Sequence, residues 1–179
     1  MTPESILHFW FEELSAPQHF AKDAALDAAI ARRFGATLQA AASGELSGWR
    51  QSARGRLAEI VVLDQFSRNI GRNTPRAFSQ DAMALALSQE AVSRGILQEL
   101  VPVEQAFLLM PYMHSESAKI HVVAEALFKQ FSTKENYEFE LRHKAIIDRF
   151  GRYPHRNAIL GRVSTVEEVE FLQQPGSSF

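Results

Sequence analysis

Helix start and stop signals recur along this chain, whereas no segment of useful length alternates apolar and polar residues as a strand does. Thr2, Pro3 and Glu4 supply a hydroxyl cap, a proline at the first helical position and an acid near the positive end of the helix dipole. Gly44 and Gly151 each follow a helical pattern, a position where glycine commonly ends a helix. These signals predict an all-α fold.

One segment is predicted to form the centre of that fold. Between about residues 52 and 69 the helical pattern is apolar nearly all round, as in buried helices, and it includes Leu57, Ile60, Val61 and Leu63. Successive antiparallel hairpins favour a stacked, tetratricopeptide-like superhelical array over a four-helix bundle. The other expected helices cover about 23–42, 79–94, 102–111, 115–131 and 133–150, and a last short one begins at the capping-box pair Ser164 and Glu167.

The totals exclude several classes of protein. With 179 residues, the chain is expected to form a single domain over 1–179, with a short frayed tail at 174–179. A net charge of −2 gives no basic field for nucleic acid or an anionic membrane. Cysteine is absent, which excludes disulfides and thiolate chemistry. The N-terminal residues do not resemble a signal peptide, so a cytoplasmic location is expected. The oligomeric state stays open.

Three polar residues fall on apolar helix faces. Asp64 follows Leu57 by seven residues and Val61 by three, so helical spacing directs it inward, with Arg68 one turn further on. Glu116 precedes Ile120 by four residues on another apolar stripe, and His143 lies on the stripe of the helix near 133–150. Burying such groups costs several kcal/mol unless they are paired and hydrogen-bonded. We therefore expect these residues to share partners.

An unusual polar segment runs from Phe150 to Arg162. Its thirteen residues contain three arginines, a histidine, an asparagine, two glycines and a proline, more than turn formation requires. Arginine forks match the geometry of carboxylates and phosphates. The site hypothesis therefore has two groups of candidates. The catalytic candidates are His114, Glu116, His155, Asp64 and His143, and the ligand-binding candidates are Arg68, Asn69, Arg152, Arg156 and Asn157.

The candidates allow several functions. The preferred interpretation is a pocket for a small anionic ligand or substrate, in which a histidine beside a carboxylate exchanges protons near neutral pH. A second is a peptide- or protein-binding helical module whose polar network is purely structural. A third is a metal-dependent enzyme with histidine and carboxylate ligands, although the spacing matches no zinc motif and nearby arginines would repel a cation. The residues name no cofactor and leave the reaction open.

Three motifs occur in the order Asp64–Asn69, Pro111–Glu116 and Phe150–Asn157, and Leu160–Arg162 follows the third. With Arg76-Ala77-Phe78 and Asp81, they resemble a widespread bacterial family catalogued as a domain of unknown function, number 924, across nearly the whole chain. The resemblance implies an all-α fold similar to tetratricopeptide-like superhelices. It brings no established activity, substrate or cofactor, and the motif residues carry over without assigned roles.

Overall fold

A computed structural model describes residues 1–178, and every regular element within that range is a helix. The N-terminal third begins with α1 (Pro3–His8), the π-helical segment η1 (Phe9–Glu13), α2 (Ala16–Phe20) and α3 (Ala24–Ala42). The elements that follow are η2 (Ser47–Gln51), α4 (Ala53–Val61), the π-helical η3 (Val62–Phe66), α5 (Ser67–Ile70), η4 (Pro75–Phe78), α6 (Asp81–Ser93), η5 (Ile96–Glu99), α7 (Pro102–Met113), α8 (Ala118–Phe131), α9 (Lys134–Phe150), η6 (Pro154–Arg156) and α10 (Val166–Leu172). The all-α prediction is confirmed.

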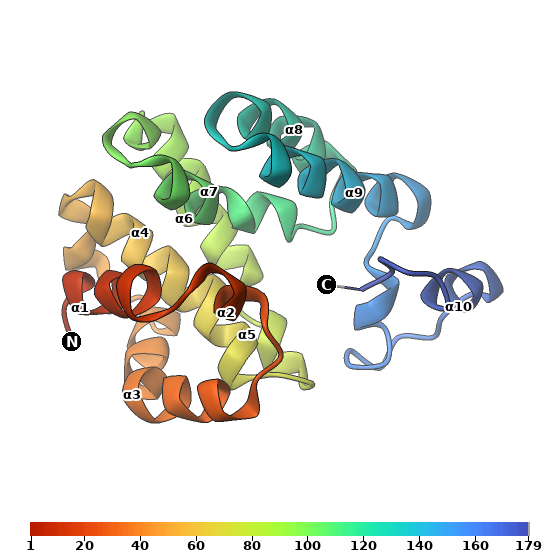
Figure 1. The fold of residues 1–179 in the computed structure, drawn as a ribbon, viewed down its shortest axis with the longest axis horizontal. Coiled ribbons are helices and arrows are strands. Elements are labelled where there is room, and N and C mark those ends of the chain that lie inside the picture. The colour runs from red at the N-terminus through yellow and green to blue at the C-terminus, as the bar shows by residue number, and fades with distance from the viewer. Residues whose placement is uncertain (179) are drawn as a thin grey trace.

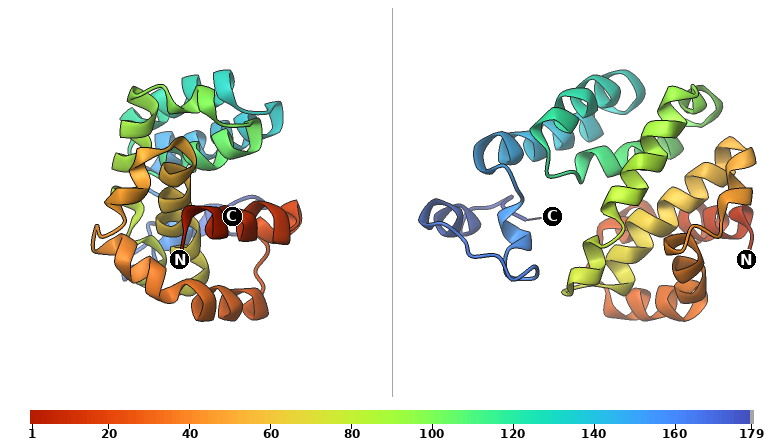
Figure 2. Two further views of the ribbon diagram at one scale, coloured as in Figure 1. Left: turned by 90° about the vertical axis from the view of Figure 1, so that its left-hand side faces the viewer. Right: turned by 180° about the vertical axis from the view of Figure 1, so that it is seen from behind.

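The helices form an arc rather than a closed bundle. In Figure 1 the chain passes from α1–α5 through α6–α9 to α10, which lies at the opposite end of the molecule from α1 and α3. The view from behind in Figure 2 shows the same order. Consecutive long helices pack in pairs, with α7 against α8 and α8 against α9. The tetratricopeptide-like detail of this arrangement stays a prediction.

The expected central helix is confirmed. α4, η3 and α5 follow one another without a break, and together they pack against α1, α3, α6 and α7. Leu57, Ile60, Val61 and Leu63 are all buried, with at most 1% of any of them exposed. We call α4, η3 and α5 together the central rod. Its many buried apolar side chains explain why elements distant in sequence pack against it.

Two predicted boundaries are wrong. Pro111 was expected to end its helix, but α7 continues to Met113. Residues on both sides of Pro111 are buried, and their packing outweighs the cost of about 3 kcal/mol for a proline inside a helix. The helix expected from about residue 115 begins later, because α8 starts at Ala118 with Ser117 as its N-cap.

The last helix begins one residue later than the spacing suggested. Its capping box joins Thr165 and Glu168, not Ser164 and Glu167. Glu168 is buried and accepts hydrogen bonds from Arg152, which sets the register of α10. Pro175 and Gly176 form a turn, and Ser177 is buried. Phe179, the end of the tail expected to fray, lies outside the described residues.

We predict that Leu63→Ala lowers the free energy of unfolding by about 2–5 kcal/mol, because it removes buried methyl groups and leaves a cavity in the central rod. Urea unfolding followed by circular dichroism measures the change. Val122→Ala is the matched control, since the Val122 side chain is 64% exposed, and its effect should stay within about 0.5 kcal/mol. Equal effects of the two substitutions would contradict the central position of the rod.

Candidate functional site

The candidate site forms where the central rod meets the end of α7 and the C-terminal segment. The rod supplies Asp64 from η3 and Arg68 from α5, one helical turn apart. His114 is the C-terminal cap of α7, Asp81 is the first residue of α6, and Arg156 ends η6. We call these five side chains the polar cluster. Five elements therefore supply neighbouring polar side chains.

Asp64 and His114 form a dyad, joined by a hydrogen bond whose donor and acceptor can be assigned. The Nδ1 atom of His114 lies 2.8 Å from Oδ1 of Asp64, and Asp64 is only 1% exposed. Burial raises the pKa of the Asp64 carboxyl, but the charge of Arg68 and the contacts of His114 outweigh burial and lower this pKa. The carboxylate is therefore ionised and can only accept, so Nδ1 carries the proton and donates it. The Nε2 atom of His114 then presents a lone pair.

That lone pair faces outward. The His114 side chain is 16% exposed, and its Nε2 is solvent-accessible and makes no hydrogen bond to residues 1–178. Burial and the nearby Arg68 lower the pKa of His114, while Asp64 opposes them by raising it. A neutral imidazole held through Nδ1 by a carboxylate is the arrangement in which a histidine accepts protons at Nε2.

One edge of the Arg68 guanidinium is paired, and another edge is unpaired. Its Nη1 and Nη2 atoms donate to the two oxygens of Asp81 at 3.0 and 3.2 Å, and Nη1 also donates to the backbone oxygen of Asp64 at 2.7 Å. The side chain is 20% exposed, and Nε is solvent-accessible without a hydrogen-bond partner among the described residues. The Nε and Nη2 edge of the guanidinium is thus available for a bidentate anion.

Arg156 is a bridge inside the cluster rather than an exposed anchor. Its guanidinium lies between the rings of Phe78 and Tyr153, 4.5 and 4.7 Å from their centroids. It donates to Oδ2 of Asp81 and to the backbone oxygen of His114, both at 3.1 Å. Because only 6% of the side chain is exposed, Arg156 mainly joins α6 to the end of α7.

Three consecutive carbonyl oxygens at the end of α7 accept side-chain hydrogen bonds. Tyr153 donates its hydroxyl to Met113 at 2.5 Å, and Arg156 reaches the oxygen of His114 as described. His121 bonds to the oxygen of Ser115 through Nε2 at 2.9 Å. Helix ends leave such carbonyls without intrahelical partners. These side chains fix the backbone that carries His114.

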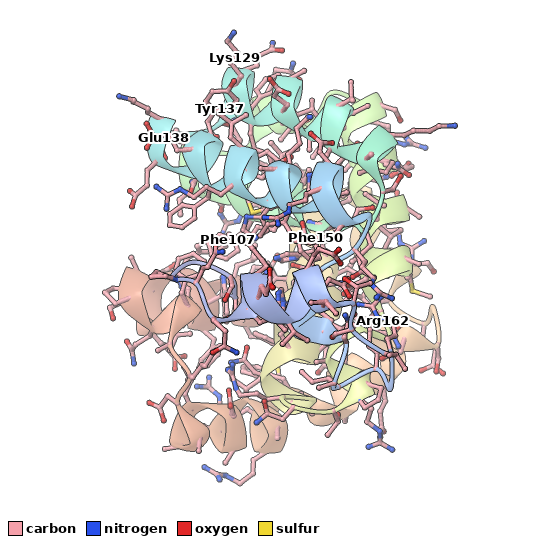
Figure 3. The ribbon with its side chains drawn as sticks, turned by 90° about the vertical axis from the view of Figure 1, so that its right-hand side faces the viewer. Phe107, Lys129, Tyr137, Glu138, Phe150 and Arg162 are labelled. Carbon is pink, nitrogen blue, oxygen red and sulfur yellow. The ribbon has the colours of Figure 1, made fainter. Side chains whose placement is uncertain are left out.

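Glu116 lies beside the cluster in a separate ion pair. Arg162, visible in Figure 3 near the short helices of the C-terminal segment, donates to both Glu116 oxygens at 2.7 and 2.9 Å. The backbone N–H of Tyr153 donates to the same carboxylate at 2.7 Å. Burial raises the pKa of Glu116, but Arg162 and Tyr153 together lower it. Glu116 therefore anchors the C-terminal segment as an anion.

The other two histidine candidates, His143 and His155, lie beside Tyr153 rather than beside Asp64. Their ring centroids lie 5.8 Å (His143) and 5.6 Å (His155) from that of Tyr153. Burial lowers the pKa of His143 to about 3 and that of His155 to about 4. His143 also bonds to the backbone oxygen of Phe139 through Nδ1, at 2.8 Å. Both rings stay neutral near pH 7.

Three ligand-binding candidates are engaged elsewhere. Asn69 donates to Asp27 at 2.8 Å. Arg152 forms a bidentate pair with Glu168 at 2.6 and 2.8 Å, and Asn157 donates to the same carboxylate at 3.2 Å. These contacts join α3 to the rod and α10 to the segment before it. The structure therefore gathers Asp64, Arg68, His114 and Arg156, with Glu116 and His155 at the border.

The described residues do not support a metal centre. Nowhere in residues 1–178 do three histidine, aspartate or glutamate side chains converge as ion ligands.

Two cavities, of about 240 and about 330 Å³, lie away from the polar cluster. The smaller is lined in part by Arg50, Arg56 and Arg94, and the larger by Arg149 and Arg152. Within the same range, no helix is long and apolar enough to cross a membrane.

The residue candidates omitted Asp81, Tyr153 and His121. Asp81 joins Arg68 to Arg156, and His121 pairs with Glu140 at 2.7 Å with both side chains fully buried. Periodicity would have helped with His121, because Ala124 and Phe128 continue its stripe along α8 at i+3 and i+7. No spacing in the sequence joins Asp81 to Arg156, since the pair depends on tertiary packing.

These features define an all-α protein with a partly exposed histidine–aspartate–arginine cluster at the end of a central helix. Residues 6–176 match the model of the family described as bacterial protein of unknown function, DUF924, and the chain belongs to this family. It is also similar to a solved structure of a protein of unknown function from Agrobacterium tumefaciens, with 34% identity over 96% of each chain and a TM-score of 0.91. No curated protein matches the chain.

We predict that Asp64→Asn destabilises the protein by about 3–5 kcal/mol near pH 7, because Arg68 loses its buried partner. Since folding lowers the pKa of Asp64, its contribution is fully present above the unfolded value of about 3.9 and is lost as the pH falls below it. The difference between wild type and variant in urea unfolding should therefore shrink below about pH 4.

The matched control for this substitution is Asp148→Asn. Asp148 is 46% exposed and pairs with Lys144 one turn away on α9, a contact worth about 0.3–0.5 kcal/mol. A loss at Asp64 no larger than that at Asp148 would show that the dyad carboxylate does not compensate a buried charge.

Proposed function

We propose that this protein binds a small anionic ligand or substrate at the open edge of Arg68, with His114 as the group that accepts a proton from it. The observation that carries the proposal is how Arg68 and His114 are paired and exposed. Both contact the same oxygen of Asp64, at 3.1 Å for Arg68 and 2.8 Å for His114, and both keep one polar edge exposed. Asp81 and the two Nη atoms of Arg156 are already paired.

The chemistry of the two open edges is complementary. The Arg68 edge offers two parallel N–H donors, which suit a carboxylate or a phosphate. His114 offers a lone pair at Nε2, and its orientation is fixed by a buried carboxylate rather than by the ligand. A histidine prepared in this way can serve as a general base once a ligand places a proton within reach. Asp64 and Arg156 would act by positioning these two groups.

The helical-module interpretation has an observation in its favour. Most charged groups of the cluster are satisfied internally, as Asp81 is by Arg68 and Arg156. A network built only for stability would have this property. A structural network gains nothing from a small anion, however, so ligand stabilisation separates the two interpretations.

The proposal predicts that phosphate or acetate raises the thermal unfolding temperature of the wild type. A ligand that binds only the folded state stabilises it by about 2.7 kcal/mol at one hundred times its dissociation constant. Arg68→Gln should abolish the shift, because it removes both donors of the open edge. Differential scanning fluorimetry with a sodium chloride series of matched ionic strength measures the specific part.

Arg32→Gln is the control for loss of charge, since Arg32 is an exposed residue of α3 outside the polar cluster. It should leave the anion response unchanged. An equal loss in both variants would reduce the effect to general screening, and the absence of any response in the wild type would reject the anion site and favour the structural network.

A further inference from the structure

A second histidine–carboxylate pair lies outside the polar cluster, between α8 and α9. The Nδ1 atom of His121 lies 2.7 Å from Oε1 of Glu140, and both side chains are fully buried. The two helices lie side by side in Figure 1 and pack closely against each other. Because water does not reach either group, the surrounding protein atoms decide which of them carries a proton.

The neighbours of the His121 Nε2 atom require a proton on that nitrogen. The backbone oxygen of Ser115 lies 2.9 Å from Nε2, and a carbonyl oxygen can only accept. The Tyr153 hydroxyl lies 3.2 Å from the same nitrogen, but it donates its own proton to the backbone oxygen of Met113 at 2.5 Å. Nε2 therefore faces two acceptors and must donate to them.

The contact at Nδ1 then needs one more proton. If His121 were neutral and Glu140 ionised, a nitrogen lone pair would face a carboxylate oxygen at 2.7 Å with no hydrogen between them. A hydrogen bond forms in only two ways: an imidazolium donates to a carboxylate, or a protonated carboxyl donates to a neutral ring. Both forms hold the same number of protons, one more than a neutral histidine and an ionised glutamate hold when they are apart.

We propose that His121 and Glu140 form a buried proton-binding site, which keeps one shared proton above neutral pH and through it joins α8, α9 and the residues that follow α7. The pair is independent of the anion site proposed at Arg68. Oε2 of Glu140 is buried and has no hydrogen-bond partner among residues 1–178. An ionised carboxylate would leave charge on that oxygen uncompensated, so the form with the proton on the carboxyl is favoured.

The charges around the pair agree with a carboxyl that keeps its proton. Burial raises the pKa of Glu140, and its hydrogen bond with His121 opposes burial without cancelling it. Of the nearby charges, Glu125 on α8 raises this pKa and Lys144 on α9 lowers it, but Lys144 donates to Asp148 instead. The other titratable or charged groups around the pair come from α9, the end of α7 and the C-terminal segment: His143, His114, Glu116, Tyr153, His155 and Arg156.

A retained proton makes stability depend on pH in a defined window. Above about pH 7.5, an unfolded histidine with a pKa of about 6.5 and an unfolded glutamate with a pKa of about 4.3 have both lost the extra proton. The folded pair keeps it, so the folded state binds more protons than the unfolded state and stability falls as pH rises. Between about pH 7.5 and 9, the unfolding equilibrium constant of the wild type should therefore rise about tenfold per pH unit.

Other groups titrate outside this window. Folding lowers the pKa of His114, His143 and His155, so these rings are neutral in both states above about pH 7.5 and add no slope there. Tyrosine and lysine side chains lose their protons at about pH 10 and above. A slope between these limits reports the shared proton.

Glu140→Gln tests the site while keeping its hydrogen bond. The glutamine amide can donate to Nδ1 of a neutral His121, so the contact remains and the titratable proton is gone. Urea unfolding between about pH 7.5 and 9 should give a nearly flat profile for this variant. Glu138→Gln is the matched control on the same helix, since Glu138, labelled in Figure 3, is 49% exposed and lies 3.7 Å from Lys134. It should keep the slope of the wild type.

A flat profile for the wild type would overturn the proposal, and so would a slope that Glu140→Gln retains. If that variant does not fold, NMR of the labelled wild type at about pH 8 measures the proton directly. Nitrogen-15 and carbon-13 spectra should show either a protonated Glu140 carboxyl or a doubly protonated His121 ring, with Nε2 protonated in both cases. A neutral His121 beside an ionised Glu140 would refute the shared proton.

Discussion

The buried charge of Asp64 is the constraint from which the arrangement of this protein follows. A carboxylate that is 1% exposed must be compensated within the fold, and Arg68 and His114 provide the compensation. Arg68 in turn needs Asp81, and Asp81 also takes Arg156. These pairs link η3 and α5 to α6, to the end of α7 and to η6.

The same constraint explains why a loop-rich C-terminal segment adopts a defined position. Its polar side chains reach the end of α7, where Tyr153 and Arg156 satisfy two carbonyl oxygens that a helix leaves open. Glu116, just beyond α7, also contacts this segment through an ion pair with Arg162. These bonds add to a small apolar cluster of Ile146, Ile147 and Tyr153, which is separate from the main core.

The sequence predicted the helices and the central rod because both depend on local spacing. It also directed Asp64 inward, since the positions of Leu57 and Val61 define the buried face of the rod. It did not predict that α7 runs through Pro111, because tertiary burial there overrides a local propensity. Nor could it separate the roles of Arg68 and Arg156, since Phe78, one of the two aromatic rings that enclose Arg156, comes from a distant segment. Partner choice among charged residues is a tertiary property.

Most polar groups of the cluster are paired with one another. The Nε2 atom of His114 and the Nε edge of Arg68 are not, so these two can take part in function without a role in stability. A group that holds the fold, such as Asp64, cannot be replaced without leaving a partner uncompensated. The Nε2 atom of His114 has no such structural duty, because the ring is positioned through Nδ1 and its backbone through Arg156. An atom that a fold orients firmly but does not use can change its bonding partner without disturbing the network behind it. The same reasoning applies to the Nε edge of Arg68, whose other fork already satisfies Asp81.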